Sequence, residues 1–195
     1  KQQVADMFNR IAFRYDFMNR FLSAGIDKGW RRKALHQLAK ENPKTILDVA
    51  TGTGDVAIMA CELLHPEKIT GIDISEKMLE LGKDKVLKLG LQHQIELQTG
   101  DSEAINFPDN TFDAVTVAFG VRNFENLEQG LKEIKRVLKP SGKLVILEFS
   151  KPKLAGIAQL YYLYMEIVAP QMASMVAKNK KAYQYLNRSV LGFPE

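Results

Sequence analysis

The stretch at residues 48–55, DVATGTGD, decides how the rest of the chain is interpreted. It joins an apolar run at Thr45–Val49 to a helical pattern at Val56–Leu64. Gly52 and Gly54 lack a Cβ atom, so the backbone can turn sharply there and come close to a ligand. A glycine turn between a strand and a helix is typical of open α/β sheets, which bind ligands at the carboxyl ends of their strands.

Strand and helix patterns alternate along the chain from this turn onward. The short β-rich runs are separated by helical stretches of the length that a right-handed crossover needs. Strands are expected at Thr45–Val49, Ile69–Ile74, Ile95–Leu97, Phe112–Phe119 and Leu144–Phe149, and helices at Val56–Leu64, Glu76–Leu89 and Leu127–Leu138. Nearly continuous apolar strands are buried on both faces, as parallel strands are. We therefore predict an α/β fold with a Rossmann-like, doubly wound, mostly parallel sheet.

The chain of 195 residues has the length of one domain. We expect residues 44–150 to form the ligand-binding sheet core, with a helical N-terminal lid at residues 1–40 and a helical C-terminal lid at residues 154–193. The sheet patterns end before residue 195, and we expect the natural protein to continue for about 40 residues as two more strands of ordinary length. Without them the fifth strand would be an exposed edge.

Composition points to an ordinary globular protein with an uneven distribution of charge. Residues 1–40 hold nine Lys and Arg but only three Asp, residues 151–195 are also basic, and the centre is acidic. This pattern suits a cationic ligand inside and an anionic surface outside, although basic residues that merely solvate helices explain it equally well. Cys61 is the single cysteine, which excludes an internal disulfide. With no apolar signal core or spanning run in the sequence, we expect a cytoplasmic protein.

Two classes of cofactor use such a glycine turn, and they require opposite charges. Gly52, Gly54 and Ala57 satisfy the dinucleotide pattern G-x-G-x-x-G/A, which is weak evidence alone. A pyrophosphate would lie beside Asp48 and Asp55, at a cost on the order of several kcal/mol in a partly buried cleft. S-adenosylmethionine carries a sulfonium and an ammonium group that these acids would attract. Charge therefore favours S-adenosylmethionine over NAD, and no metal is expected.

Acidic residues also follow the next two predicted strands. Asp73 ends the second strand, where a carboxylate can accept both ribose hydroxyls, although it can also serve as a helix N-cap. Asp101 follows the third strand and can accept the adenine amino group, while the backbone amide of Ser102 donates to a ring nitrogen. A surface turn explains Asp101 and Ser102 in isolation. Three acids at three successive strand ends beside a glycine turn favour a site.

Four motifs resemble the quinone-biosynthesis C-methyltransferases: residues 47–55 (LDVATGTGD), 107–113 (FPDNTFD), 119–123 (FGVRN) and 147–152 (LEFSKP). The flanks agree at residues 15–19 (YDFMN), 30–32 (WRR) and 182–186 (AYQYL), so the resemblance covers essentially the whole chain. It implies a class I methyltransferase fold and methylation of demethylmenaquinone or of the ubiquinone precursor, a polyprenyl methoxy-benzoquinol. It also implies S-adenosylmethionine contacts at Thr53, Asp73, Asp101 and Ser102. Relatives often have serine where this chain has Ala118, which is not assigned to the donor.

The polar residues after the fourth strand are our candidates for catalysis. The ring carbon of a quinol becomes nucleophilic when a neighbouring hydroxyl loses its proton. We expect Arg122 to stabilise the resulting oxyanion, with Asn123 and Tyr15 orienting the ring. The alternative for Arg122 is a salt bridge to a nearby acid.

The polyprenyl quinol implied by the resemblance also gives the flanks a function. The apolar, tyrosine-rich residues 154–170 are predicted to cover the sheet and line a channel for the isoprenoid tail, while peripheral contact with the inner face of the membrane is the alternative. An RNA-binding protein is disfavoured, because the basic charge is diffuse. The sequence leaves open the oligomeric state, monomer or homodimer, and the choice between the menaquinone and ubiquinone pathways, with a preference for menaquinone.

Overall fold

The computed structural model describes residues 1–23, 25–149, 185 and 189 of the chain. Its centre is one sheet of parallel strands in the order β3-β2-β1-β4-β5. The strands span Thr45–Val49 (β1), Lys68–Asp73 (β2), Ile95–Thr99 (β3), Phe112–Ala118 (β4) and Leu138–Leu147 (β5). The order reverses between β1 and β4, so the predicted doubly wound sheet is confirmed.

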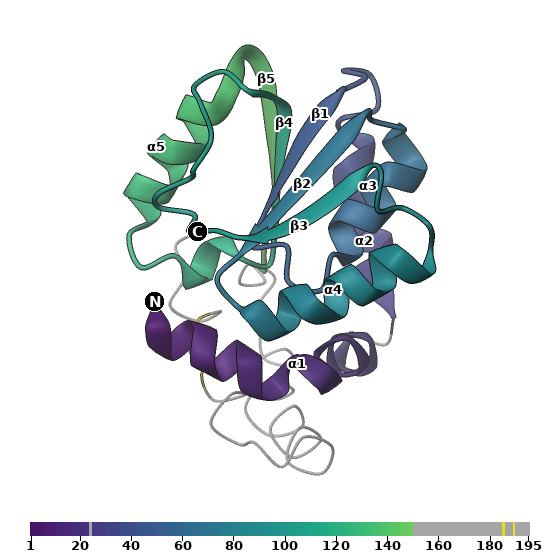
Figure 1. Ribbon diagram of the computed structural model, residues 1–195, viewed down its shortest axis with the longest axis vertical. Helices are drawn as coiled ribbons and strands as arrows, with labels where there is room; N and C mark the ends of the chain where they lie inside the picture. The colour runs from purple at the N-terminus through teal and green to yellow at the C-terminus, as the bar shows by residue number, and fades with distance from the viewer. Residues whose placement is uncertain (24, 150–184, 186–188, 190–195) are drawn as a thin grey trace, which may run out of the picture.

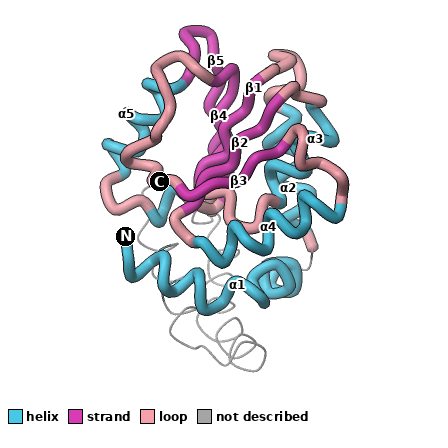
Figure 2. Tube along the Cα trace, in the orientation of Figure 1, coloured by secondary structure: helices cyan, strands magenta, loops and turns pink. Residues whose placement is uncertain are grey.

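Helices cover both faces of the sheet (Figures 1 and 2). They span Gln2–Leu22 (α1), Ile26–His36 (α2), Asp55–Leu64 (α3), Glu76–Lys88 (α4) and Leu127–Val137 (α5), with a short 3₁₀ helix at Val121–Asn123. Alternate residues of β1 point to opposite faces: Ile46 packs with apolar residues of α2, α3 and α4, and Leu47 packs with those of α5. Strands buried on both faces explain the nearly continuous apolar runs in the sequence.

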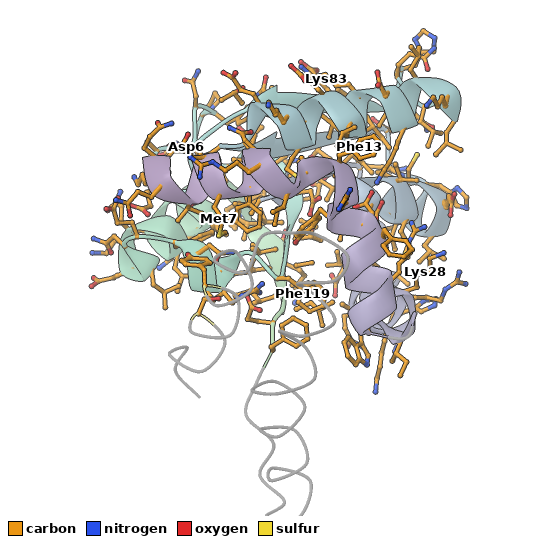
Figure 3. All side chains as sticks on the ribbon, turned by 90° about the horizontal axis from the view of Figure 1, so that it is seen from below. Asp6, Met7, Phe13, Lys28, Lys83 and Phe119 are labelled. Carbon is orange, nitrogen blue, oxygen red and sulfur yellow. The ribbon has the colours of Figure 1, made fainter. Side chains whose placement is uncertain are left out.

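The N-terminal helix lies across the end of the sheet at which the strands terminate (Figure 1). Two of its residues, Ala5 and Ala12, are buried and lie seven residues apart, on one face of the helix. The helix is continuous from Gln2 to Leu22. The helix nevertheless changes direction beyond Phe13, which Figure 3 shows on its outer side. The bend lets α1 follow the edge of the sheet down to α2.

The fifth strand corrects one sequence prediction. We expected the helix to extend to Leu138 and the strand to begin at Leu144, whereas α5 ends at Val137 and β5 begins immediately after it. Leu138 pairs with Phe112, and pairing resumes at Lys143 opposite Ala114, with a register shift between them. The residues in between, 139–142, contain a proline and a glycine, which occur in edge strands at such irregularities. In the described part of the sheet, β5 lies at the edge.

The predicted C-terminal lid at residues 154–193 lies outside the described residues apart from Tyr185 and Ser189. The division of the chain into a core and two lids therefore stays a prediction.

Candidate active site

An open pocket of about 690 Å³ lies where the strands end, beneath α1. Helix α1 contributes Val4, Phe8 and Tyr15 to its wall, and most of the other lining residues come from the ends of the strands and the loops that follow them. Six of the residues predicted from the sequence line this pocket: Gly52, Asp73, Asp101, Ser102, Tyr15 and Asn123.

Asp73 is fixed at the end of β2 by backbone amides. Its two carboxylate oxygens accept hydrogen bonds from the amides of Gly52 and Ser75, each at 2.8 Å. Burial raises the pKa of Asp73, and these backbone hydrogen bonds only partly oppose the effect. Ser75, rather than Asp73, is the N-cap of α4, because its hydroxyl accepts from the amide of Met78. Asp73 thus lies in the pocket wall with hydrogen-bond capacity left for a ligand.

Asp101 and Ser102 line the pocket after β3, but the Asp101 carboxylate already has two partners. The Lys1 ammonium donates to Oδ2 at 2.8 Å, and the amide of Glu103 donates to Oδ1 at 2.9 Å. Burial alone would raise the pKa of Asp101, and these interactions outweigh it and lower the pKa. A ligand amino group at this position would share an oxygen with Lys1.

The glycine turn has the conformation that its sequence requires. Gly52 (φ 57°) and Gly54 (φ 77°) both adopt the left-handed region. No atom lies within 4 Å of the place where a Gly52 Cβ would be, so the turn faces open space. Two non-glycine residues, Ala50 (φ 55°) and Phe119 (φ 58°), are also left-handed directly after β1 and β4. Each costs on the order of 1 kcal/mol, and such strain is concentrated at functional sites. These two conformations could not be predicted from the residue types.

Asp48 lies behind the main pocket rather than in its wall. It faces an adjoining cavity of about 390 Å³, which shares Tyr15, Gly52 and Phe119 with the first. The hydroxyls of Thr51 and Thr116 donate to its two oxygens, each at 2.6 Å. Burial raises the pKa of Asp48 to about 6, despite these hydrogen bonds.

Thr53 and Asp55 belong to a charged cluster that joins four helices. The Thr53 hydroxyl donates to Asp16 at 2.7 Å and accepts from the Lys85 ammonium at 2.9 Å. Lys85 also pairs with Asp16 and with Asp55, and Asp55 lies 3.5 Å from Arg31. The charge of Asp55 is therefore neutralised by the protein. Our expectation that Asp55 attracts a cationic ligand stays a prediction, and the sequence did not reveal these partners.

Arg122 is buried beside the pocket and pairs with an acid, the alternative that the sequence left open. Its side chain is 3% exposed, forms a salt bridge with Glu148, and donates to the Phe119 carbonyl at 2.7 Å. Its Nε–H is buried and has no acceptor among the residues that the structure describes. Neither Arg122 nor Gly54, the N-cap residue of α3, is part of the pocket wall.

Asn123 and Tyr15 both line the pocket, from the 3₁₀ helix and from α1 respectively. The Asn123 amide oxygen accepts from the hydroxyl of Tyr185 at 3.2 Å. Within the described residues, no group of three His, Cys, Asp or Glu side chains is arranged to hold a metal ion.

The residues around the pocket fit S-adenosylmethionine. Asp73 offers carboxylate oxygens to ribose hydroxyls, the Ser102 amide is available to an adenine nitrogen, and the open glycine turn leaves room for the rest of the donor. Beside the turn lie an anion, Asp48, and a cation, Arg31, as a ligand carrying both an ammonium and a carboxylate requires.

Comparison with known proteins gives a consistent result. The model of the ubiE/COQ5 methyltransferase family matches residues 1–195. The demethylmenaquinone methyltransferase of Bacteroides fragilis is 48% identical over 194 residues, which is 100% of this chain and 79% of that protein. The ubiquinone/menaquinone biosynthesis C-methyltransferase UbiE of Geotalea daltonii is 47% identical over 99% of this chain and 82% of that protein.

Among solved structures, a SAM-dependent methyltransferase from Aquifex aeolicus is 26% identical with a TM-score of 0.54, covering 75% of this chain and 78% of that one. The fold, the pocket and the relatives therefore agree: the chain belongs to the ubiE/COQ5 methyltransferase family and is an S-adenosylmethionine-dependent methyltransferase.

Proposed function

We propose that the enzyme transfers a methyl group to a ring carbon of a polyprenyl quinol, with demethylmenaquinol as its substrate. The observation that carries this proposal is the 48% identity to the B. fragilis demethylmenaquinone methyltransferase across the full chain. A ubiquinone precursor is the second candidate, favoured by the similarity to the UbiE protein of G. daltonii, whose name covers both pathways.

The proposed donor contacts follow the carboxyl edge of the sheet. We assign Asp73 to the ribose hydroxyls, and Asp101 with the Ser102 amide to the adenine ring. Gly52 and Gly54 allow the backbone to approach the methionine end. S-adenosylmethionine, when bound, supplies an electrophilic methyl group, and catalysis depends strongly on positioning.

Two further residues are assigned to the methionine end. We assign the Asp48 carboxylate, behind the turn, to the ammonium group of the donor. The Thr53 hydroxyl is held by hydrogen bonds with Asp16 and Lys85. We therefore propose that Thr53 acts on the donor through the shape of the turn as well as through its hydroxyl.

The acceptor side is assigned to Tyr15, Asn123 and Arg122. Tyr15 and Asn123 both line the pocket and can orient the quinol ring. Arg122 precedes Asn123 in the chain, and its buried Nε–H has no acceptor among the described residues, so it gains from any oxyanion that comes within reach. Glu148 balances its charge and holds the guanidinium in place.

A membrane-surface location is part of the same proposal. No helix in the described part of the chain is long and apolar enough to cross a bilayer. The outer face of α1 carries Phe13, 90% exposed, and Phe17, 57% exposed, next to the exposed Arg10. Aromatic and basic side chains together suit a lipid–water interface. We propose that the enzyme works on the cytoplasmic side of the membrane in which its substrate dissolves.

A methylation assay with two acceptors tests the function. The enzyme is given labelled S-adenosylmethionine and either demethylmenaquinol or the polyprenyl methoxy-benzoquinol, with matched tails. We expect label on the ring carbon of the first, with kcat/KM at least about tenfold higher than for the second. The oxidised quinone is the control, because it has no hydroxyl to ionise. Label on the benzoquinol alone would favour the second candidate, and label on neither, with donor binding intact, would reject quinols as substrates.

The role of Arg122 has its own test. Arg122→Lys keeps the charge and removes the Nε–H, and we expect kcat to fall about 10- to 100-fold while S-adenosylhomocysteine binding stays unchanged. Unchanged kcat would show that Arg122 is only a structural partner of Glu148.

A further inference from the structure

Arg31, within the motif at residues 30–32, is a buried cation beside the site. It lies on α2 with 7% of its surface exposed. It lines the cavity that it shares with Tyr15, Asp48 and the glycine turn. Its guanidinium carbon lies 5.6 Å from the centre of the Phe119 ring, which forms part of both cavities. Arg31 therefore faces the space behind the main pocket.

The hydrogen bonds of Arg31 are incomplete. Its Nη1 donates to Asp27 at 2.8 Å and to Asp55 at 3.5 Å. Its Nε–H is buried and finds no acceptor among the described residues. An arginine that served only to pair with a carboxylate would use its planar fork to make two parallel hydrogen bonds. Leaving a buried donor unpaired is energetically costly, so such groups call for a functional explanation.

The two acids beside Arg31 have further partners. Asp55 is shared with Lys85 and Arg20, at 2.7 Å and 3.8 Å. Asp27 takes Arg31 as its cationic partner and also accepts a hydrogen bond from the Ser23 hydroxyl at 2.8 Å. Asp55 therefore does not depend on Arg31 alone, and the pair with Asp27 uses only one nitrogen of the guanidinium.

We propose that Arg31 binds the carboxylate of the methionyl end of S-adenosylmethionine through its Nε–H. The amino-acid end of the donor carries an ammonium and a carboxylate, and the cavity wall presents Asp48 and Arg31 with the opposite charges. The two other acids in this wall, Asp16 and Asp55, are both paired with Lys85. The glycine turn between them is open to the main pocket, where the adenosyl end is assigned. The inference rests on the methyl donor and is independent of the identity of the quinol.

Calorimetric titration with two ligands tests this assignment. S-adenosylhomocysteine and its decarboxylated form, which keeps the adenosine, the sulfur and the amine, are titrated into the wild-type enzyme and into Arg31→Gln. We expect Arg31→Gln to weaken binding of S-adenosylhomocysteine about 10- to 100-fold and binding of the decarboxylated ligand less than twofold. Arg32→Gln, which changes the exposed neighbour, is the matched control and should bind both ligands as the wild type does.

The comparison between ligands makes the result specific. Equal weakening for both ligands, or none for either, would overturn the proposal. If Arg31→Gln does not fold, the Arg31 Nε–H signal in the ¹⁵N spectrum of the wild-type enzyme decides. It should shift on addition of S-adenosylhomocysteine and not on addition of the decarboxylated ligand, and identical responses would likewise overturn the proposal.

Discussion

The two ends of the sheet hold buried or partly buried aspartates in opposite electrostatic states. At the carboxyl end, burial raises the pKa of Asp48 to about 6 and also raises that of Asp73. At the amino end of β4, burial would raise the pKa of Asp113 as well, but its hydrogen bonds outweigh this and lower the pKa to about 2. The folded protein thus disfavours ionisation of aspartate at the carboxyl end of the sheet and favours it at the amino end.

The number and type of donors explain the difference. Asp113 Oδ2 accepts from the amides of Lys44 and Thr45 and from the Thr45 hydroxyl, and Oδ1 accepts from the Lys139 ammonium at 2.7 Å. Asp113 therefore ties the start of β4 to the starts of β1 and β5. Asp48 has two hydroxyl donors, and Asp73 has backbone amides. The carboxyl end keeps acids whose charge the protein leaves partly uncompensated, as a site for a cationic ligand requires.

The largest effect is expected at Asp73. Asp73→Ala removes both carboxylate oxygens assigned to the ribose, and we expect S-adenosylhomocysteine binding to weaken about 100- to 1,000-fold. The free energy of unfolding should change little, because the lost hydrogen bonds from Gly52 and Ser75 are offset by relief from burying a charge. Calorimetry and urea unfolding measure the two quantities. A large loss of stability with normal binding would assign Asp73 to the structural class of Asp113.

Asp113 should show the reverse behaviour. Asp113→Ala loses four hydrogen bonds, and the full pKa shift corresponds to about 2.5 kcal/mol, which solvent screening at this partly exposed side chain reduces to about 1–2 kcal/mol. Because the folded pKa lies below the ordinary value, this stability is present above about pH 4 and is lost as the pH falls toward 2. Urea unfolding across that range checks it, and donor binding by the folded variant should be normal.

A smaller effect of opposite sign is expected at Asp48. Its folded pKa lies above the ordinary value of 3.8, so the wild-type enzyme loses stability as the pH rises from about 4 to about 6. Asp48→Asn removes this term and should raise the free energy of unfolding by about 1 kcal/mol above pH 6, with no gain near pH 4. Thr51 and Thr116 can rotate their hydroxyls to suit the amide. A variant that is less stable than the wild type at pH 7 would show that the Asp48 charge is compensated after all.

Strand periodicity and the glycine turn were sufficient to predict the sheet and the acids at its carboxyl edge. The apolar runs are continuous because each strand is buried on two faces, and the left-handed Gly52 and Gly54 are required for the turn. The end of α5 was not predictable in the same way, because the register shift after Leu138 depends on pairing with β4. A proline and a glycine in the sequence indicate a turn, whether or not a strand passes through it.

The partners of charged residues were equally hidden in the sequence. Asp55 forms ion pairs with Arg31 and Lys85, which are distant from it in the sequence and come close only in the folded chain. Arg31 belongs to the motif at residues 30–32, but only the structure shows that its buried Nε–H lacks an acceptor among the described residues. Local sequence thus predicts which residues lie at the carboxyl edge of the sheet. Tertiary packing decides which of them keep hydrogen-bonding capacity for a ligand.

The smallest predicted effect concerns the contact between α1 and the glycine turn. Asp16 on α1 accepts a hydrogen bond from the Thr53 hydroxyl and forms an ion pair with Lys85. Two turns earlier on the same helix, Asn9 accepts a hydrogen bond from the Ser75 hydroxyl at 2.8 Å. Asp16→Asn keeps the size of the side chain and removes its charge. Because the cluster is partly exposed, we expect S-adenosylhomocysteine binding to weaken only about two- to fivefold, with the loss growing as salt is lowered. Asp6→Asn, on the exposed side of α1, is the control. A salt-independent loss would mean that Asp16 acts through its shape, and unchanged binding would mean that Lys85 alone holds Thr53 at the carboxyl end.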